Sequence, residues 1–187
     1  MNPVFGTVAG QLTDDSEMSL SLAYGLLDSQ NDFNSNLISY YFGDWYLSNP
    51  FDIGTTTINA LRAVKNSKIY IDQKYQDFID KNYISLDNYI YFDKILSESM
   101  MKNAEKFNKN SLSNGFLMRK IPICLYSLRY LKNEEVKDEE IHLNNYEDFV
   151  RINVEETKLT HSNLLLHEIS VLYALIVTRM IYLKSYC

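Results

Sequence analysis

Residues 12–27 read LTDDSEMSLSLAYGLL, and the spacing of their apolar side chains decides the fold. Met18, Leu22 and Leu26 follow one another at steps of four residues, which places them on one face of an α-helix. This pattern predicts a helix over residues 16–27. The same period recurs along a chain that has only three prolines and six glycines to interrupt it. We therefore predict an all-α fold.

The helical period predicts further helices beyond the opening one. In residues 32–48 the apolar positions again repeat every four residues, and the pattern stops at Pro50, because a residue before proline avoids the helical conformation. A short helix is expected around 58–64 and another over 97–107. Residues 159–183, LTHSNLLLHEISVLYALIVTRMIYL, predict a long helix that is apolar almost all round, and such a helix is expected to be buried between neighbours.

Three stretches give a weaker or different signal. Residues 66–93 are rich in Tyr and Lys and alternate in part like a β-strand. Residues 113–131 combine an Asn-Gly turn with an apolar segment that contains Pro122. Residues 132–149 are acidic and polar, as in a solvated loop with helical pieces. No repeat or linker divides the chain, so residues 1–187 are predicted to form one domain.

The composition limits the classes of function. With 46% hydrophobic and 22% charged residues, the 187-residue chain is typical of a globular protein. The 18 basic residues are scattered and the net charge is -6, which argues against a nucleic-acid partner, because phosphate binding needs a concentrated basic face. The two cysteines, Cys124 and Cys187, form neither a disulfide framework nor a zinc set.

Nothing at the start of the sequence has the pattern of a signal peptide. The most apolar segment, residues 164–183, carries Glu168 and Arg179, and its longest uncharged piece, residues 169–178, is too short to span a bilayer. We therefore expect a cytoplasmic protein without a membrane anchor.

Thr13, Asp14 and Asp15 admit two compatible interpretations. Asp14 followed three residues later by Glu17 has the pattern of a capping box, and acids are favourable at a helix N-terminus. Alternatively, the hydroxyl and the two carboxylates present adjacent hard oxygens, the ligands that Mg²⁺ prefers. A bound cation would also relieve the repulsion between the two carboxylates.

Two later motifs are also ambiguous. Asn114-Gly115 is typical of a turn or a helix end, because both residues tolerate a positive φ, but it could also be a close backbone approach to a ligand, with Arg119 nearby to meet a phosphate. Thr160 or Ser162 is a natural N-cap for the last helix. His161 between them is either structural or part of a site.

Taken in order, four stretches resemble the ADP-ribosylglycohydrolase family, which includes the glycohydrolase that reactivates dinitrogenase reductase. They are LTDDSEMSLSLAYGLL (12–27), WYLSNPFDIGTTTINAL (45–61), SNGFLMRKIP (113–122) and LTHSN (159–163). The resemblance covers about residues 10–180, apart from the Tyr-rich stretch and the acidic loop, which look like insertions.

The resemblance implies a compact orthogonal bundle of helices around a dinuclear Mg²⁺ site. Such a site hydrolyses the bond between ADP-ribose and a modified protein side chain or a small molecule. By this resemblance the first metal-ligand cluster is Thr13, Asp14 and Asp15, and the catalytic residues are Asp14 and Asp15. The ADP-ribose site is implied to consist of Asn114, Gly115, Met118, Arg119 and His161, with a pocket floor formed by Asp52, Gly54 and Thr55.

The sequence departs from the family at both flanks of this site. It contains neither the Gly-Asp-rich helix that family members have before the first cluster, nor the Asp-x-Asp-Thr motif that supplies the remaining metal ligands. Three hypotheses follow: a hydrolase with one or two Mg²⁺ ions and substitute ligands, a module that binds ADP-ribose or metal without turnover, or one half of a split enzyme. A second copy or a complementing chain would then cover the apolar 164–183 helix.

Overall fold

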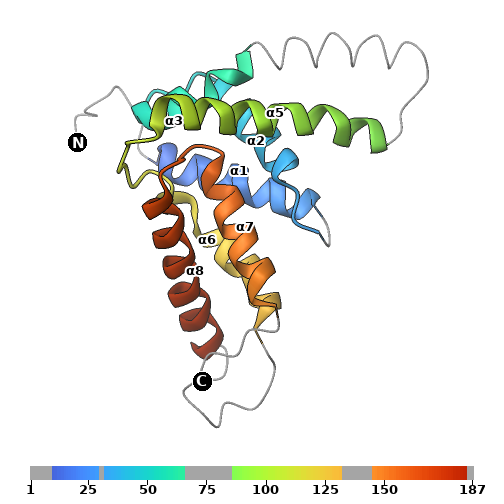
Figure 1. Ribbon diagram of the computed structural model, residues 1–187, viewed down its shortest axis with the longest axis vertical. Helices are drawn as coiled ribbons and strands as arrows, with labels where there is room; N and C mark the ends of the chain where they lie inside the picture. The colour runs from blue at the N-terminus through green and yellow to red at the C-terminus, as the bar shows by residue number, and fades with distance from the viewer. Residues whose placement is uncertain (1–9, 30–31, 66–85, 132–144, 185–187) are drawn as a thin grey trace.

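The computed structural model describes residues 10–29, 32–65, 86–131 and 145–184. These residues form α-helices and two short 3-10 helices, and none of them forms a β-strand, so the predicted all-α fold is confirmed (Figure 1). The elements in chain order are α1 (Asp14–Asp28), α2 (Ser35–Leu47), α3 (Thr55–Leu61), α5 (Leu86–Asn108), η1 (Leu117–Arg119), α6 (Ile121–Tyr126), η2 (Ser127–Tyr130), α7 (Tyr146–Lys158) and α8 (Leu164–Lys184).

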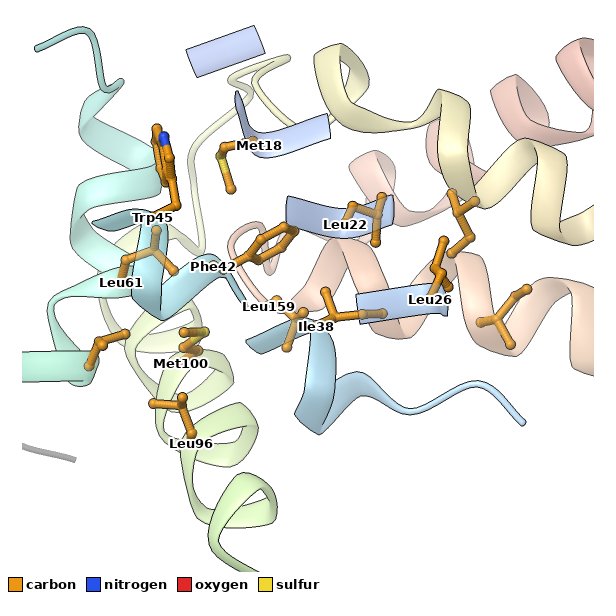
Figure 2. Packing of buried hydrophobic residues seen from close by; sticks show 13 residues of the cluster. Met18, Leu22, Leu26, Ile38, Phe42, Trp45, Leu61, Leu96, Met100 and Leu159 are labelled. Carbon is orange, nitrogen blue, oxygen red and sulfur yellow. The ribbon is translucent and has the colours of Figure 1, made fainter. Parts of the chain in front are cut away.

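The core forms where α1 packs against α2. Met18, Leu22 and Leu26, the residues that predicted the first helix, are all buried, and Figure 2 shows them on the side of α1 that faces Ile38 from α2. The two helices approach closely because of Gly25: a Cβ at that position would lie 2.8 Å from the Cα of Ile38. The four-residue period in the sequence therefore describes the buried face of α1 correctly.

The remaining helices surround this pair. α5 lies across α2 and α3, while α7 and α8 run side by side at a steep angle to α5, with α6 next to them (Figure 1). This steep crossing agrees with the orthogonal packing that was expected. Leu96 and Met100 from α5, and Leu159 directly after α7, join the same core (Figure 2). Ile152 from α7 belongs to it as well.

Several local predictions need correction. The strand-like pattern is wrong for residues 86–93, which belong to α5, and the rest of that stretch, 66–85, lies outside the described residues, as do residues 132–144 of the acidic run. Neither Thr160 nor Ser162 caps the last helix. The side chain of Asn163 does so, since its Oδ1 accepts a hydrogen bond from Leu165 N at 3.0 Å.

α8 buries several small and polar residues together with Leu166 and Tyr182, and it exposes many of its large apolar ones. Ser170, Ala174 and Thr178 face the protein, and Thr178 donates to the Cys124 carbonyl of α6 at 3.1 Å. The outward face carries the large exposed side chains Leu164, Leu165, Ile169, Leu172, Ile176, Met180 and Leu183. The expectation that α8 is buried all round is therefore wrong in this structure.

α8 is also the one helix in the described part of the chain that is long and apolar enough to cross a membrane by length and composition, and 28% of its most apolar window is buried. A single helix of this kind is weak evidence for a membrane span, because a core helix meets the same criteria.

Candidate functional site

The acidic cluster lies at the first turn of α1, but it does not form a capping box. Thr13 occupies the N-cap position, and its hydroxyl makes no capping hydrogen bond. Asp14 is the first helical residue, and its Oδ1 accepts from the backbone N–H of Asp15 at 3.0 Å. The carboxylate of Glu17 accepts from the indole Nε1 of Trp45 at 2.7 Å. The capping-box interpretation is therefore wrong, and the Thr13 hydroxyl is not engaged in capping.

Negative charge is concentrated around Asp14. Its pKa is raised above the usual value, first because the carboxyl is partly desolvated, and then because Asp52 and Asp15 lie close enough to repel its charged form. Asp52 belongs to the loop between α2 and α3, so two segments that are distant in sequence contribute to one acidic cluster. A cation bound here would offset this repulsion.

The donor set at this cluster suits one hydrated ion. In the described part of the chain no group of three or more His, Cys, Asp or Glu side chains is arranged to hold a metal ion. Mg²⁺ is commonly held by one or two carboxylates and keeps several waters. Thr13, Asp14 and Asp15 fit that pattern for a single ion, and they fall short of the ligands that two ions require.

The predicted pocket floor lies next to the acidic cluster. Gly54 occupies the N-cap position of α3 with an ordinary φ of -68°, and Thr55 begins the helix. Both residues are exposed, as is Asp52. The next residue, Thr56, forms a hydrogen bond with Ser111 between the two hydroxyl oxygens at 2.9 Å, which connects this segment to the turn that follows α5.

Residues 113–115 form a turn, but for a different reason from the one predicted. Neither Asn114 nor Gly115 has a positive φ. The turn is held by a hydrogen bond from Leu117 N to the Asn114 carbonyl at 2.9 Å and another from Gly115 N to Ser113 Oγ at 3.3 Å. Asn114 is exposed. A Cβ on Gly115 would lie 3.8 Å from Nε2 of His161, so the glycine leaves space beside that imidazole.

Arg119 is fully buried and already bonded. Its Nε donates to Glu156 Oε1 at 2.5 Å, and its NH2 group donates to Thr160 Oγ1 at 2.7 Å. Its guanidinium also lies 4.7 Å from the centre of the Phe42 ring. In this conformation Arg119 therefore does not face solvent, where a ligand phosphate would meet it. Met118 beside it packs against the core.

Glu156 is the buried anion that balances this group. Its second oxygen lies 2.6 Å from Lys120 Nζ, and all three charged side chains have no exposed surface. Burial alone would raise the pKa of Glu156, but the adjacent Arg119 and Lys120 charges hold it below its usual value. Glu156 is thus ionised between two cations.

His161 lies at the end of this buried group. Its Nδ1 is 2.8 Å from Thr160 Oγ1, and the ring of Phe116 packs edge-on against the imidazole at 5.3 Å between centres. The side chain has no exposed surface, and its Nε2 has no hydrogen-bond partner among the described residues. Burial, with the positive charge of Arg119, lowers the pKa of His161 to about 3, so the imidazole is neutral near pH 7.

Asn108 connects these segments, although the sequence did not single it out. Its amide nitrogen donates to the Thr56 carbonyl at 2.7 Å and to the Thr160 carbonyl at 2.9 Å, which ties α3 to the His161 loop. Glu156 was missed as well. It lies one helical turn after the buried Ile152 and two turns after the buried Phe149, so the same apolar period that predicted the helices would have marked it as buried.

Comparison with known proteins supports one family. The family model described as ADP-ribosylglycohydrolase matches residues 1–185. A protein of Acanthamoeba polyphaga mimivirus named "putative ADP-ribosyl glycohydrolase" is 30% identical over 115 residues, which are 62% of this chain and 25% of that protein. The matched region thus spans a quarter of the relative's length. The match over nearly the whole chain shows that it belongs to the ADP-ribosylglycohydrolase family.

Proposed function

We propose that the protein is a Mg²⁺-dependent hydrolase that cleaves the N- or O-glycosidic bond between ADP-ribose and a modified protein side chain or a small molecule. Family membership supports a glycohydrolase-like function. The observation that carries the proposal is the meeting of four segments in one region. Asp52 lies close to Asp14, and Asn108 bonds both the Thr56 and the Thr160 backbone.

Each segment has a distinct role in this proposal. Thr13, Asp14 and Asp15 hold the ion, and a bound Mg²⁺ would supply the positive charge that grips the ribose hydroxyls and orients a water. The segment with Asp52, Gly54 and Thr55 forms the adjacent floor of the pocket.

The turn at Asn114 and Gly115 faces the ADP-ribose in this proposal, and His161 lies behind the turn. Met118 and Arg119 lie in the protein interior in this proposal and support the turn without touching the ligand. Because the Arg119 guanidinium is buried on Glu156 and Thr160, it orients the site rather than touching a phosphate.

A second candidate function is binding of ADP-ribose without turnover. The donor set at Thr13–Asp15 favours it, because one incomplete ligand set provides less transition-state charge stabilisation than a dinuclear site. The two candidates share the same binding residues and differ only in whether the glycosidic bond is cleaved.

The deciding experiment incubates the purified chain with ADP-ribosylated arginine and serine peptides, with Mg²⁺ or with a chelator, and measures release of ADP-ribose. The proposal expects Mg²⁺-dependent release that is lost in the variant Asp14→Asn, Asp15→Asn. The matched control is Glu98→Gln, Glu105→Gln, which removes the same charge from exposed positions on α5. Binding of ADP-ribose without any release would support the second candidate, and release that persists in the Asp14, Asp15 variant would contradict the metal role.

We also propose that a second copy of the chain covers the apolar face of α8. Four exposed apolar residues stand symmetrically about Ile176: Leu172 and Met180 four positions away, and Ile169 and Leu183 seven positions away. In an antiparallel pair of α8 helices crossing at Ile176, these residues would meet each other. The same register would place the exposed Glu168 of one copy beside the exposed Lys184 of the other, so the charges are complementary.

A further inference from the structure

The hydrogen bonds around Thr160 have a defined direction. The Arg119 guanidinium only donates, so Thr160 Oγ1 must accept at this contact of 2.7 Å. The hydroxyl has one hydrogen of its own, and its other neighbour is His161 Nδ1 at 2.8 Å. If Thr160 donates to Nδ1, both atoms are satisfied. If Nδ1 donated instead, the buried hydroxyl hydrogen would have no acceptor in the described contacts, and such groups are normally paired.

The series of hydrogen bonds that ends at His161 begins at Glu156. Its carboxylate accepts from Arg119 Nε at 2.5 Å and so orients the guanidinium, whose planar donors are fixed relative to one another. The NH2 group then points at Thr160. Lys120 holds the other carboxylate oxygen at 2.6 Å, which prevents the carboxylate from turning away.

With Nδ1 as an acceptor, the single proton of the neutral imidazole resides on Nε2. This buried N–H has no partner among the described residues. It lies beside Gly115, where a Cβ would be 3.8 Å away, and the adjoining Asn114 is exposed. An oxygen of a bound molecule at this turn would satisfy it.

We propose that Glu156 is a positioning residue that acts through Arg119 and Thr160 to fix His161 as the Nε2–H tautomer, so that His161 donates a hydrogen bond to a ligand oxygen at the Ser113–Gly115 turn. The identity of this ligand as ADP-ribose rests on the proposed function, whereas the tautomer is a property of the free protein. The two parts are therefore tested separately.

The tautomer is measured by long-range ¹H–¹⁵N correlation NMR of the ¹⁵N-histidine-labelled full chain at pH 7. The sequence has three histidines, and substituting each one in turn assigns its NMR signals. His167 is an internal reference, because its Nε2 lies 2.8 Å from the His161 carbonyl and must carry the proton there. His161 is expected to show the same pattern, with the proton on Nε2. A proton on Nδ1 of His161 would overturn the proposal.

The relay is tested with Thr160→Val, which removes the hydroxyl at similar volume, and Thr160→Ser, which keeps it. Thr160→Val is expected to shift the His161 tautomer towards a mixture, and Thr160→Ser to retain the pattern of the parent protein. Glu156→Gln keeps one acceptor for Arg119 but loses the charge, and an intermediate shift is expected. Because Glu156→Gln could fail to fold, the Thr160 pair decides: an unchanged tautomer in folded Thr160→Val would refute the relay.

The ligand part is tested with Gly115→Ala. Its φ is not positive and the new Cβ makes ordinary contacts, so the protein should fold with the same His161 tautomer. ADP-ribose binding, measured by calorimetry, is expected to weaken at least tenfold, because the methyl group occupies the space beside Nε2. Unchanged affinity would refute the donation to a ligand. If the parent protein does not bind ADP-ribose at all, the proposed function and the ligand part fail, while the NMR result on the tautomer still stands.

Discussion

Arg119 Nε lies 2.5 Å from Glu156 Oε1, and both side chains are completely shielded from solvent. Lys120 adds a second buried cation to the same carboxylate. Removing one member of such a group leaves a buried charge without its partner, and this costs far more than loss of an exposed ion pair. The same helix, α7, offers the comparison, because the adjacent Glu155 pairs with Arg151 at 3.7 Å on the surface.

Glu156→Ala is therefore expected to lower the free energy of unfolding by about 3–5 kcal/mol. Glu155→Ala, one residue away, should lower it by less than about 1 kcal/mol, because its partner stays hydrated. Urea denaturation at pH 7 followed by circular dichroism measures both. Equal losses in the two variants would show that the buried charges do not depend on Glu156.

Stability should fall as the pH is lowered below about 6.5. The pKa of His161 is about 3 in the folded protein and 6.5 for an unperturbed imidazole, so the unfolded chain binds the proton first. Unfolding therefore takes up a proton between these two pH values, and the stability that a neutral His161 confers is present above pH 6.5 and lost as the pH falls towards 3.

Between pH 7 and pH 5 this effect amounts to about 2 kcal/mol. Urea denaturation of the parent protein and of His161→Asn at both pH values measures it, and the variant should lose less stability than the parent. His167, whose pKa is also lowered by burial, contributes in the same direction in both proteins and cancels from the comparison. Equal losses of stability in the two proteins would mean that the folded state does not lower the pKa of His161.

The contact of α1 with α2 should not tolerate a side chain at Gly25. In Gly25→Ala the Cβ would lie 2.8 Å from the Cα of Ile38, so one backbone must move, and a loss of about 1–3 kcal/mol is expected. Gly54→Ala is the control, because its φ is -68° and no atom from the described part of the chain lies within 4 Å of the new Cβ. That change should stay within about 0.5 kcal/mol. Thermal unfolding compares the two, and a tolerated Gly25→Ala would contradict the close helix contact.

The proposed pairing of two α8 helices predicts self-association that depends on the opposite charges of Glu168 and Lys184. Glu168→Lys alone and Lys184→Glu alone each place like charges together at both ends of the antiparallel pair, so each should weaken association, while the double variant should restore it. Sedimentation equilibrium measures this, and Ile176→Glu on the axis should abolish it. A monomeric parent protein would exclude the second copy and leave a different chain or a membrane as the cover of this face.

The sequence predicted the elements whose cause is local. The period of Met18, Leu22 and Leu26 decides both that α1 is a helix and which of its faces is buried, because one turn of helix repeats the same direction in space. The stop after α2 was also local: the helix ends at Leu47, ahead of Pro50. The four motifs were local too, and they identified the family.

Where local patterns competed, only the tertiary structure decided. Glu17 had the correct spacing for a capping box, yet its carboxylate bonds Trp45, twenty-eight positions away, because the indole N–H buried beside α1 requires an acceptor. Thr160 had the pattern of an N-cap, yet its hydroxyl accepts a hydrogen bond from Arg119. The residue that caps α8 is Asn163.

The candidate site followed the same division. The residue types and their order came from the sequence. The burial of Arg119, its pairing with Glu156, and a His161 Nε2 that has no partner in the described ranges did not. A charged side chain can be buried only where another segment brings its counter-charge, and that meeting of distant segments is decided by how the helices pack.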